Sequence, residues 1–187
     1  CHYCIIPHVR GPVRSLPLAQ AVAQAEKLVR AGHAEIVLSG IHIGAYGRDL
    51  GPGEDLPALL QRLCRLDGLQ RLRLGSIEPQ QFSEALLTVI ADEPKICRHL
   101  HIPLQSGCDR VLGAMGRKYT TQDYAALLKR LRQLLDDPAV TSAVIAGYPG
   151  EDEDDHQAGR EFCRVMGFAG LHIFPYSRRR GTPAAAP

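Results

Sequence analysis

Residues 140–151, VTSAVIAGYPGE, join an apolar run to a loop of glycine and proline. A short apolar run bounded by such residues is typical of a strand buried in a parallel sheet. Similar strand signals begin near residues 35, 70, 98 and 170, so they recur about every 30 to 40 residues. Helix signals lie between them. This alternation predicts βαβ units, a parallel sheet and right-handed crossovers.

The helix signals are apolar residues at helical spacing, preceded or followed by capping residues. They cover residues 18–29, 56–66, 84–93, 109–115 and 124–135, with a weaker one at 154–167. The residues placed to cap or stop these helices are Ser15, Gly32, Asp55, Ser83 and the pair Thr120 and Asp123, which resembles a capping box.

Two architectures fit this order: an open doubly wound sheet, or a β/α barrel, whole or partial. Both place ligands at the carboxyl ends of the strands. A loop and a helix precede the first strand signal, so we expect a strand to be missing upstream. The loops after the strands combine glycine or proline with polar residues, which favours a functional rim over simple turns.

Size and composition set limits on the function. A chain of 187 residues suits one domain with a sizeable core. The net charge of +2 is too small to indicate nucleic-acid binding by itself. No apolar run approaches the roughly 18 residues of a membrane span, and no signal peptide is evident. Six cysteines are too sparse for a disulfide scaffold, which indicates reduced thiols and hence a cytoplasmic protein.

Cys1 and Cys4 form a C-x2-C pair whose chemistry the spacing leaves open. A zinc site needs two more ligands, and a haem attachment needs histidine where Ile5 stands. A thioredoxin-like pair opens a helix, which Pro7 disfavours. An iron–sulfur cluster needs three or four thiolates, so one would lie upstream. The cluster and a structural or degenerate pair remain the two alternatives.

The residues around the pair, CHYCIIPHVRGPVRS, resemble the cluster-binding loop of the radical S-adenosylmethionine (SAM) methylthiotransferases. The resemblance continues through LSGIHIGAYGRDL, RLGSIEP, HLHIPLQSGCDRVLGAMGRKY, AGYPGE and LHIFPYSRRRGTPAA. It implies a partial (β/α)6 TIM-like barrel without its first strand, residues 1–187 being a fragment of the radical SAM core domain. The family's N-terminal methylthiotransferase domain and its C-terminal RNA-binding, TRAM-type domain would lie outside this chain.

Two stretches, GIHIGAYGRDL and FPYSRRRGTPAA, are most similar to the branch that methylthiolates C2 of N6-threonylcarbamoyladenosine next to the tRNA anticodon. The alternatives are the isopentenyladenosine branch, the branch that modifies a ribosomal-protein Asp, and an inactive truncated fragment. In this family a 4Fe-4S cluster splits SAM into a 5′-deoxyadenosyl radical, and an auxiliary 4Fe-4S cluster lies in the N-terminal domain. The fragment alone is expected to be inactive, because the third cluster cysteine would lie upstream.

The resemblance also implies the site residues. The cluster ligands in this chain are Cys1 and Cys4, and no further catalytic residue is expected. The residues implied to contact SAM are Ser39, Gly40, Glu78, Gln105, Ser106, Arg117, Gly147, Glu151, Phe174 and Pro175. Simpler roles are a solvated arginine for Arg117, a cap for Glu78 and end-of-strand core for Phe174. The chain departs from the family at Ala143, usually Asp, and at Tyr148, usually Phe.

Basic residues are expected near the mouth of the barrel, where they could contact the phosphates of a tRNA anticodon stem-loop. They are Arg10, Arg14, Arg178, Arg179 and Arg180. A solvated surface is the alternative for these side chains. The resemblance further implies an electron donor for the cluster, no membrane partner and a monomeric state.

Overall fold

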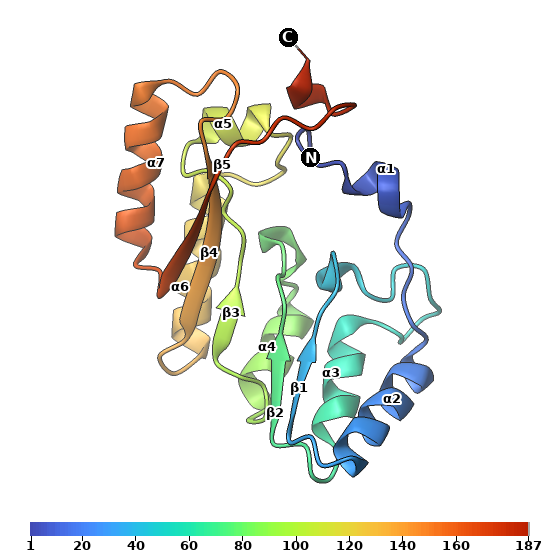
Figure 1. The fold of residues 1–187 in the computed structure, drawn as a ribbon. Coiled ribbons are helices and arrows are strands. Elements are labelled where there is room, and N and C mark those ends of the chain that lie inside the picture. Colours follow the sequence, from blue (N-terminus) through green and yellow to red (C-terminus); the bar gives the residue numbers. More distant parts are fainter. Residues whose placement is uncertain (187) are drawn as a thin grey trace. The chain divides into compact units, whose positions relative to one another are not determined.

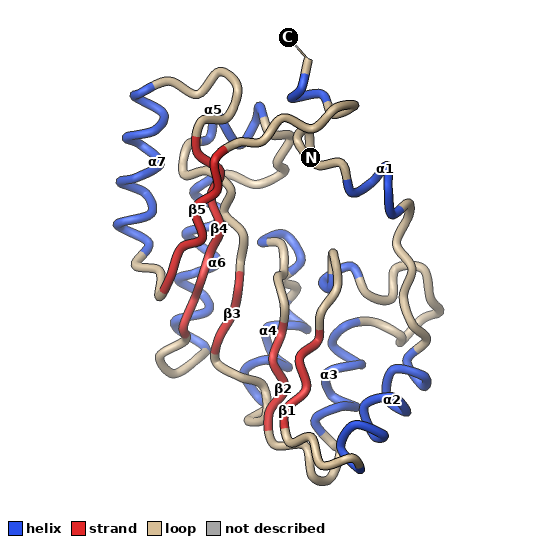
Figure 2. The backbone as a smooth tube through the Cα atoms, in the orientation of Figure 1, coloured by secondary structure: helices blue, strands red, loops and turns tan. Residues whose placement is uncertain are grey.

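The computed structural model describes residues 1–186, in which helices alternate with strands (Figures 1 and 2). The helices are α1 (Ile6–Arg10), α2 (Leu18–Arg30), α3 (Leu56–Cys64), α4 (Glu84–Asp92), α5 (Asp109–Ala114), α6 (Thr121–Leu134) and α7 (Glu153–Met166). The strands are β1 (Glu35–Leu38), β2 (Arg71–Leu74), β3 (His99–His101), β4 (Ala139–Ala146) and β5 (Gly170–Pro175), and short 3-10 turns are η1 (Ile43–Ala45), η2 (Pro79–Gln81) and η3 (Pro183–Ala185). All five strand predictions, and the α/β class, are confirmed.

These elements divide into two compact units, which are described separately. Unit 1 comprises Cys1–Pro12, Ile102–Arg130 and the chain from Val140 onward. Unit 2 comprises Val13–His101 and Leu131–Ala139. Among residues 1–186, no helix is both long enough and apolar enough to cross a membrane.

Unit 2 is built on the parallel pair β1 and β2, which align Glu35 with Arg71 and Leu38 with Leu74. The other edge of β2 bonds the segment that leads into β3. There the Leu72 N–H donates to the Lys95 carbonyl (2.7 Å), and the Cys97 N–H donates to the Leu72 carbonyl (2.9 Å). β2 therefore lies between two partners, and its apolar face is buried.

The core of unit 2 is made of leucines and isoleucines from the predicted helices and strands. Its fully buried members include Leu60, Leu63, Leu72, Leu86 and Ile90, which come from α3, β2 and α4. The burial of such side chains supplies most of the favourable free energy of folding.

Two of the predicted caps in unit 2 are confirmed and one is wrong. Asp55 accepts from the Ala58 N–H (2.9 Å) and Ser83 from the Leu86 N–H (3.2 Å). Ser15 does not cap α2. The helix starts after Pro17, the Leu18 N–H donates to the Glu54 carboxylate (2.8 Å), and the Ser15 hydroxyl accepts from a distant backbone N–H.

Unit 1 contains the parallel pair β4 and β5, which align Thr141 with Gly170 and Ala146 with Pro175. The segment after Ile102 bonds the other edge of β4, since the Ile102 N–H donates to the Thr141 carbonyl (2.9 Å). α7 lies along one face of this pair (Figure 1). The predicted capping box is confirmed: the Asp123 N–H donates to the Thr120 hydroxyl (3.1 Å) and the Thr120 N–H to the Asp123 carboxylate (2.8 Å).

Two local features of unit 1 were not predicted. α1 begins directly after the cysteine pair, with Pro7 in its first turn, where a missing N–H costs no hydrogen bond. At α7, Asp152 and Asp155 form a reciprocal capping box: each carboxylate accepts from the other residue's N–H, at 3.0 and 3.1 Å.

Candidate functional site

The residues implied for the site are distributed over both units. Unit 1 carries Cys1, Cys4, Gln105, Ser106, Arg117, Gly147, Glu151, Phe174 and Pro175, together with Arg10 and Arg178–Arg180. Unit 2 carries Ser39, Gly40, Glu78 and Arg14. The structure brings residues together within unit 1, at the carboxyl ends of β4 and β5.

The cysteine pair lies on a turn that leads into α1. Cys1 is exposed, Cys4 is half-buried, and both are free thiols. Within residues 1–186, no three His, Cys, Asp or Glu side chains are grouped so that they could hold a metal ion. The pair offers only sulfur donors, which is the chemistry that an iron–sulfur cluster requires, and it could supply two of the three or four thiolates.

The residues between the cysteines are fixed by unit 1. The His2 N–H donates to the Met115 carbonyl (2.9 Å), and the Tyr3 ring meets the Tyr148 ring edge-on at 6.2 Å. Tyr148 in turn meets Tyr176 edge-on at 5.5 Å. The cysteine loop is thereby packed against α5 and the loops after β4 and β5. Sequence reasoning treated His2 and Tyr3 only as spacers.

Tyr148 stands where the resemblance predicts a phenylalanine, and its hydroxyl makes a hydrogen bond. It donates to the Ala114 carbonyl at 3.1 Å. Burial, and secondarily the nearby Tyr176, raise the pKa of Tyr148. The hydroxyl therefore stays protonated near neutral pH and remains a donor.

Arg117 is half-buried between tyrosine rings. Its guanidinium carbon lies 5.6 Å from the centre of the Tyr3 ring and 5.9 Å from that of Tyr119, and it donates to the Tyr3 hydroxyl. Such cation–π contacts stabilise a partly desolvated arginine. The alternative of a freely solvated Arg117 is therefore wrong.

Gln105 has a left-handed backbone, with φ of 69°, which is uncommon outside glycine. β4 holds it there, because the Gln105 N–H donates to the Ala143 carbonyl (2.8 Å) and the Gln105 carbonyl accepts from Ile145 (2.9 Å). Ser106 is buried, and its hydroxyl accepts from the Cys108 N–H at 3.2 Å. Strained residues fixed in this way are typical of ligand sites.

Gly147 and Glu151 bound the turn after β4. Gly147 has a φ of 72° that a side chain would disfavour. The Glu151 carboxylate accepts from the Tyr148 N–H at 2.9 Å and lies 3.8 Å from His156 Nδ1. Glu151 therefore closes its own turn, and its side chain is 8% exposed.

Phe174 and Pro175 end β5, and both are exposed. Phe174 aligns with Ile145, and His172 with Ala143, so these four side chains share one face of the pair. With 54% of its surface exposed, Phe174 is not end-of-strand core, and that alternative is wrong.

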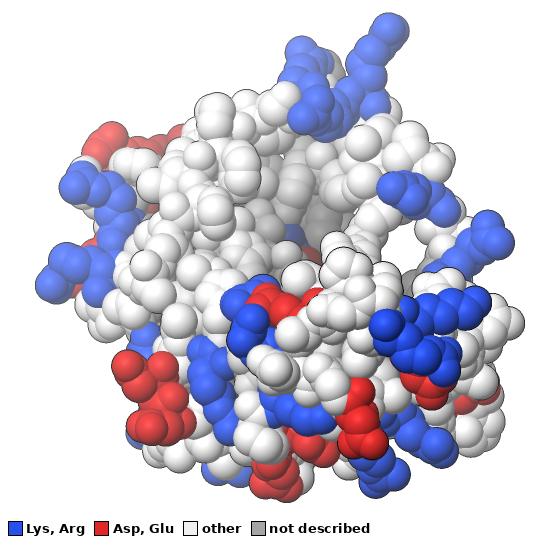
Figure 3. All heavy atoms as spheres, turned by 60° about the horizontal axis from the view of Figure 1, so that its bottom comes forward, with Lys and Arg blue, Asp and Glu red and all other residues white. Residues whose placement is uncertain are grey.

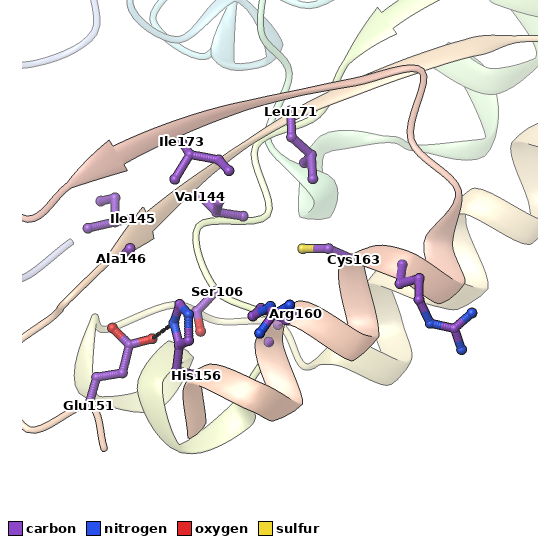
Figure 4. Close-up of a pocket in the computed structure, with 13 residues that line it drawn as sticks. Ser106, Val144, Ile145, Ala146, Glu151, His156, Arg160, Cys163, Leu171 and Ile173 are labelled. Carbon is purple, nitrogen blue, oxygen red and sulfur yellow. Dashed lines mark ion pairs between the residues drawn. The ribbon is translucent and has the colours of Figure 1, made fainter. Parts of the chain in front are cut away.

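A pocket of about 320 Å³ lies on the opposite face, between α7 and the β4–β5 pair (Figure 4). Val144, Leu171 and Ile173 border it from the strands and Cys163 from the helix, while Glu151 and His156 lie at one end. Burial raises the pKa of the Cys163 thiol. Two of the residues expected to contact SAM, Ser106 and Glu151, line this pocket, whereas Phe174 lies on the other face of the β4–β5 pair.

In unit 2, Ser39 and Gly40 directly follow β1. A Cβ on Gly40 would lie 3.1 Å from an Ile43 methyl group, so the chain is tightly turned there. Glu78 precedes η2 and makes no side-chain capping hydrogen bond. The capping alternative for Glu78 is therefore wrong.

The basic residues are divided between the units, with Arg14 in unit 2 and the others in unit 1. All five are exposed, and Arg178 also donates to the Ala185 carbonyl at 2.8 Å. On the face drawn in Figure 3, acidic side chains lie beside some of the basic ones.

Comparison with known proteins finds similarity to curated methylthiotransferases. It is 44% identical to threonylcarbamoyladenosine tRNA methylthiotransferase MtaB of Bacillus subtilis, over 99% of this chain and 41% of the relative. It is 39% identical to ribosomal protein uS12 methylthiotransferase RimO of Lachnoclostridium phytofermentans (99% and 42%) and 37% identical to tRNA-2-methylthio-N(6)-dimethylallyladenosine synthase of Natranaerobius thermophilus (99% and 41%). The chain spans about two fifths of the length of these relatives.

Solved structures share the fold. Coproporphyrinogen III oxidase HemN of Escherichia coli matches 90% of this chain and 39% of its own, with a TM-score of 0.64 and 15% identity. SuiB of Streptococcus suis, bound to S-adenosylmethionine, matches 98% and 39%, with a TM-score of 0.65 and 12% identity. The model of the radical SAM superfamily matches residues 1–163. The resemblance read from the motifs is thus confirmed, and the chain belongs to the radical SAM superfamily.

Proposed function

We propose that the chain is part of the catalytic core of a tRNA methylthiotransferase that acts at C2 of N6-threonylcarbamoyladenosine next to the anticodon. The observation that carries the proposal is the identity of 44% to MtaB over 99% of the chain, against 36–41% for the isopentenyl-type tRNA enzymes and 39% for RimO. The stretches after β1 and β5 favour the same branch.

On this proposal Cys1 and Cys4 ligate a 4Fe-4S cluster, together with a third thiolate from the longer protein. When bound and reduced, the cluster supplies the electron that cleaves SAM. An auxiliary 4Fe-4S cluster and an electron donor would be supplied outside this chain. The role of the described residues is to hold the ligand loop and to bind SAM.

The residues proposed to hold SAM offer three kinds of contact. Exposed backbone groups at Ser39 and Gly40 suit its amino group. Arg117 suits its carboxylate through paired N–H donors. Glu78, Gln105 and Ser106 offer hydrogen bonds, and Gly147, Glu151, Phe174 and Pro175 would line the adenosine.

The substrate contacts are proposed to come from the basic residues. Arg10, Arg14, Arg179 and Arg180 are exposed and can reach phosphates, while Arg178 is partly committed to the Ala185 carbonyl. A base in an anticodon loop is unpaired and can be splayed into a pocket. A monomeric, cytoplasmic enzyme accords with this substrate.

The test is nucleoside mass spectrometry of tRNA from cells that lack the gene encoding this chain. We expect the methylthio-threonylcarbamoyladenosine peak to disappear and its precursor to accumulate, and the intact gene, but not a Cys1→Ala variant, to restore it. An unchanged peak overturns the substrate assignment. Loss of methylthio-isopentenyladenosine, or of the modified aspartate of the ribosomal protein, would instead assign another branch.

A second test concerns the isolated chain of 187 residues. With two of three thiolates, it should retain well under four irons and four sulfides per chain after reconstitution. Iron and sulfide analysis measures this directly. A full, stable cluster on the isolated chain contradicts the ligand assignment.

A further inference from the structure

His2, between the two cysteines, makes three hydrogen bonds within unit 1. Its N–H donates to the Met115 carbonyl, its ring Nδ1 contacts the Ala114 carbonyl oxygen, and its carbonyl accepts from the Ala184 N–H, each at 2.9 Å. Ala114 and Met115 end α5, where helix carbonyls lack partners within the helix. The spacer residue therefore ties the cysteine loop to the end of a helix and to η3.

The contact at Nδ1 defines the tautomer of the ring. A carbonyl oxygen can only accept, so Nδ1 of His2 must carry the hydrogen. The second ring nitrogen, Nε2, is then the unprotonated one in the neutral ring.

The same Ala114 oxygen also accepts from the Tyr148 hydroxyl, at 3.1 Å. A carbonyl oxygen has two lone pairs and can serve both donors. Tyr148 belongs to the turn between Gly147 and Glu151, so one oxygen joins that turn to the cysteine loop. A phenylalanine at residue 148 could not make this bond.

Gly116 provides the space for the His2 ring. A Cβ at Gly116 would lie 2.8 Å from His2 Nε2 and 2.9 Å from its Cδ2. Gly116 also has a φ of 70° and ends α5 in a Schellman motif, with the Arg117 N–H donating to the Leu112 carbonyl (2.9 Å). Glycine is thus required for the turn and for the ring.

We propose that His2 is a positioning residue, which acts through the Ala114 carbonyl to hold Cys1 and Cys4 in one geometry relative to the turn at Tyr148. This inference rests on the proposed function only in naming the cluster that the two cysteines would bind. The hydrogen bonds of His2 that hold the loop are present in the chain without any cofactor. Ordering the ligand loop beforehand lowers the entropy cost of binding.

The first experiment reads the tautomer by nitrogen-15 NMR of the 187-residue chain, at a pH above the ordinary histidine range. We expect His2 to show the Nδ1–H form. A ring with hydrogen on Nε2 overturns the proposal, because the bond to Ala114 could not exist.

The second experiment follows alkylation of Cys4 by iodoacetamide, resolved from Cys1 by peptide mass spectrometry. Loss of one hydrogen bond should raise the rate at half-buried Cys4 by about 2- to 10-fold. We expect this for His2→Ala and His2→Gln. His2→Asn, whose amide N–H reaches the place of Nδ1–H, should restore the slow rate. Equal rates for Asn and Ala overturn the role of the donor.

Two further variants separate anchoring from unfolding. Tyr148→Phe keeps the ring and its packing, so a smaller rise in the Cys4 rate is expected with an unchanged circular dichroism spectrum. His33→Ala, at an exposed histidine of unit 2, should change nothing. The two proposals can fail separately. If His2 shows the expected tautomer and alkylation rates but the intact gene does not restore the modification of tRNA, the proposed function is wrong and the positioning role of His2 stands. If the tRNA modification is restored but His2 lacks the expected tautomer or alkylation rates, only the positioning role is wrong.

Discussion

Strands β2 and β5 are both short and rich in apolar residues, yet the protein buries them differently. In β2, Leu72 is fully buried and Leu74 is 3% exposed. In β5, Ile173 is 67% exposed and Phe174 is 54% exposed. β2 is bonded on both edges and faces a complete core, whereas β5 pairs with β4 alone among residues 1–186 and faces the pocket beside α7. The apolar pattern of a stretch predicts that its backbone is extended, but the elements packed against the strand determine how much of its surface is buried.

The largest expected effect tests this difference directly. Leu72→Ala should destabilise the protein by about 2 to 5 kcal/mol, because it removes a fully buried side chain and leaves a cavity. Ile173→Ala should change the free energy of unfolding by no more than about 0.5 kcal/mol. Urea denaturation measures both. A similar loss for both variants would mean that Ile173 is covered.

The next test concerns the close contact between α7, which lies beside β5, and the loop that precedes α5. A Cβ at Gly107 would lie 2.8 Å from the Gly159 carbonyl oxygen and 2.9 Å from the Phe162 Cβ. Gly107→Ala should therefore cost about 1 to 3 kcal/mol. Gly113→Ala is the matched control: it lies within α5 with nothing inside 4 Å, and should stabilise by about 0.5 to 1 kcal/mol. A neutral Gly107→Ala would show that α7 can move away from this loop.

The parts of the fold predicted from sequence rest on local signals. Asp55, Ser83 and Thr120 cap helices that begin at the next residue, and the strand signals needed only a few adjacent apolar residues. Ser15 shows the limit of this reasoning. It has the chemistry of a cap, but its hydroxyl bonds Gly47, 32 residues away.

The candidate site depends on contacts that no local pattern contains. His2 meets Ala114 across 112 positions of sequence, and its ring occupies the space that a side chain at residue 116 would need, in addition to the positive φ of the turn there. The motif resemblance pointed to the cysteines and the loops, because motifs preserve residues that meet in the folded protein. It did not indicate that His2 and Tyr3, between the cysteines, hold the loop in place.

The cost of removing a helix cap should be similar in the two units, because it does not depend on how well a neighbouring strand is buried. Ser83→Ala at α4 of unit 2 and Asp152→Ala at α7 beside β5 each remove one side-chain acceptor from a helix start. Each should cost about 0.5 to 2 kcal/mol, whereas Ser83→Gly should cost only a few tenths. A loss at Asp152 well above this range would show that its bond to Arg110 adds to the cap.

The smallest effect near neutral pH comes from the buried thiols of the two units. Burial raises the pKa of Cys64 to about 11, above the value of about 8.5 for an unfolded thiol. Because the folded state disfavours the thiolate, this contribution to stability is complete below about pH 8.5 and is lost as the pH rises toward 11. The difference in unfolding free energy between the protein and Cys64→Ala should therefore be constant from pH 6 to 8 and shrink at pH 10, measured in urea with a reductant present.

Cys163, half-buried beside β5, also has a pKa raised by burial, so its contribution to stability should change with pH in the same direction. A difference at Cys64 that does not change with pH would mean that its thiol is open to water, which would weaken the contrast between the complete core of β2 and the open pocket of β5.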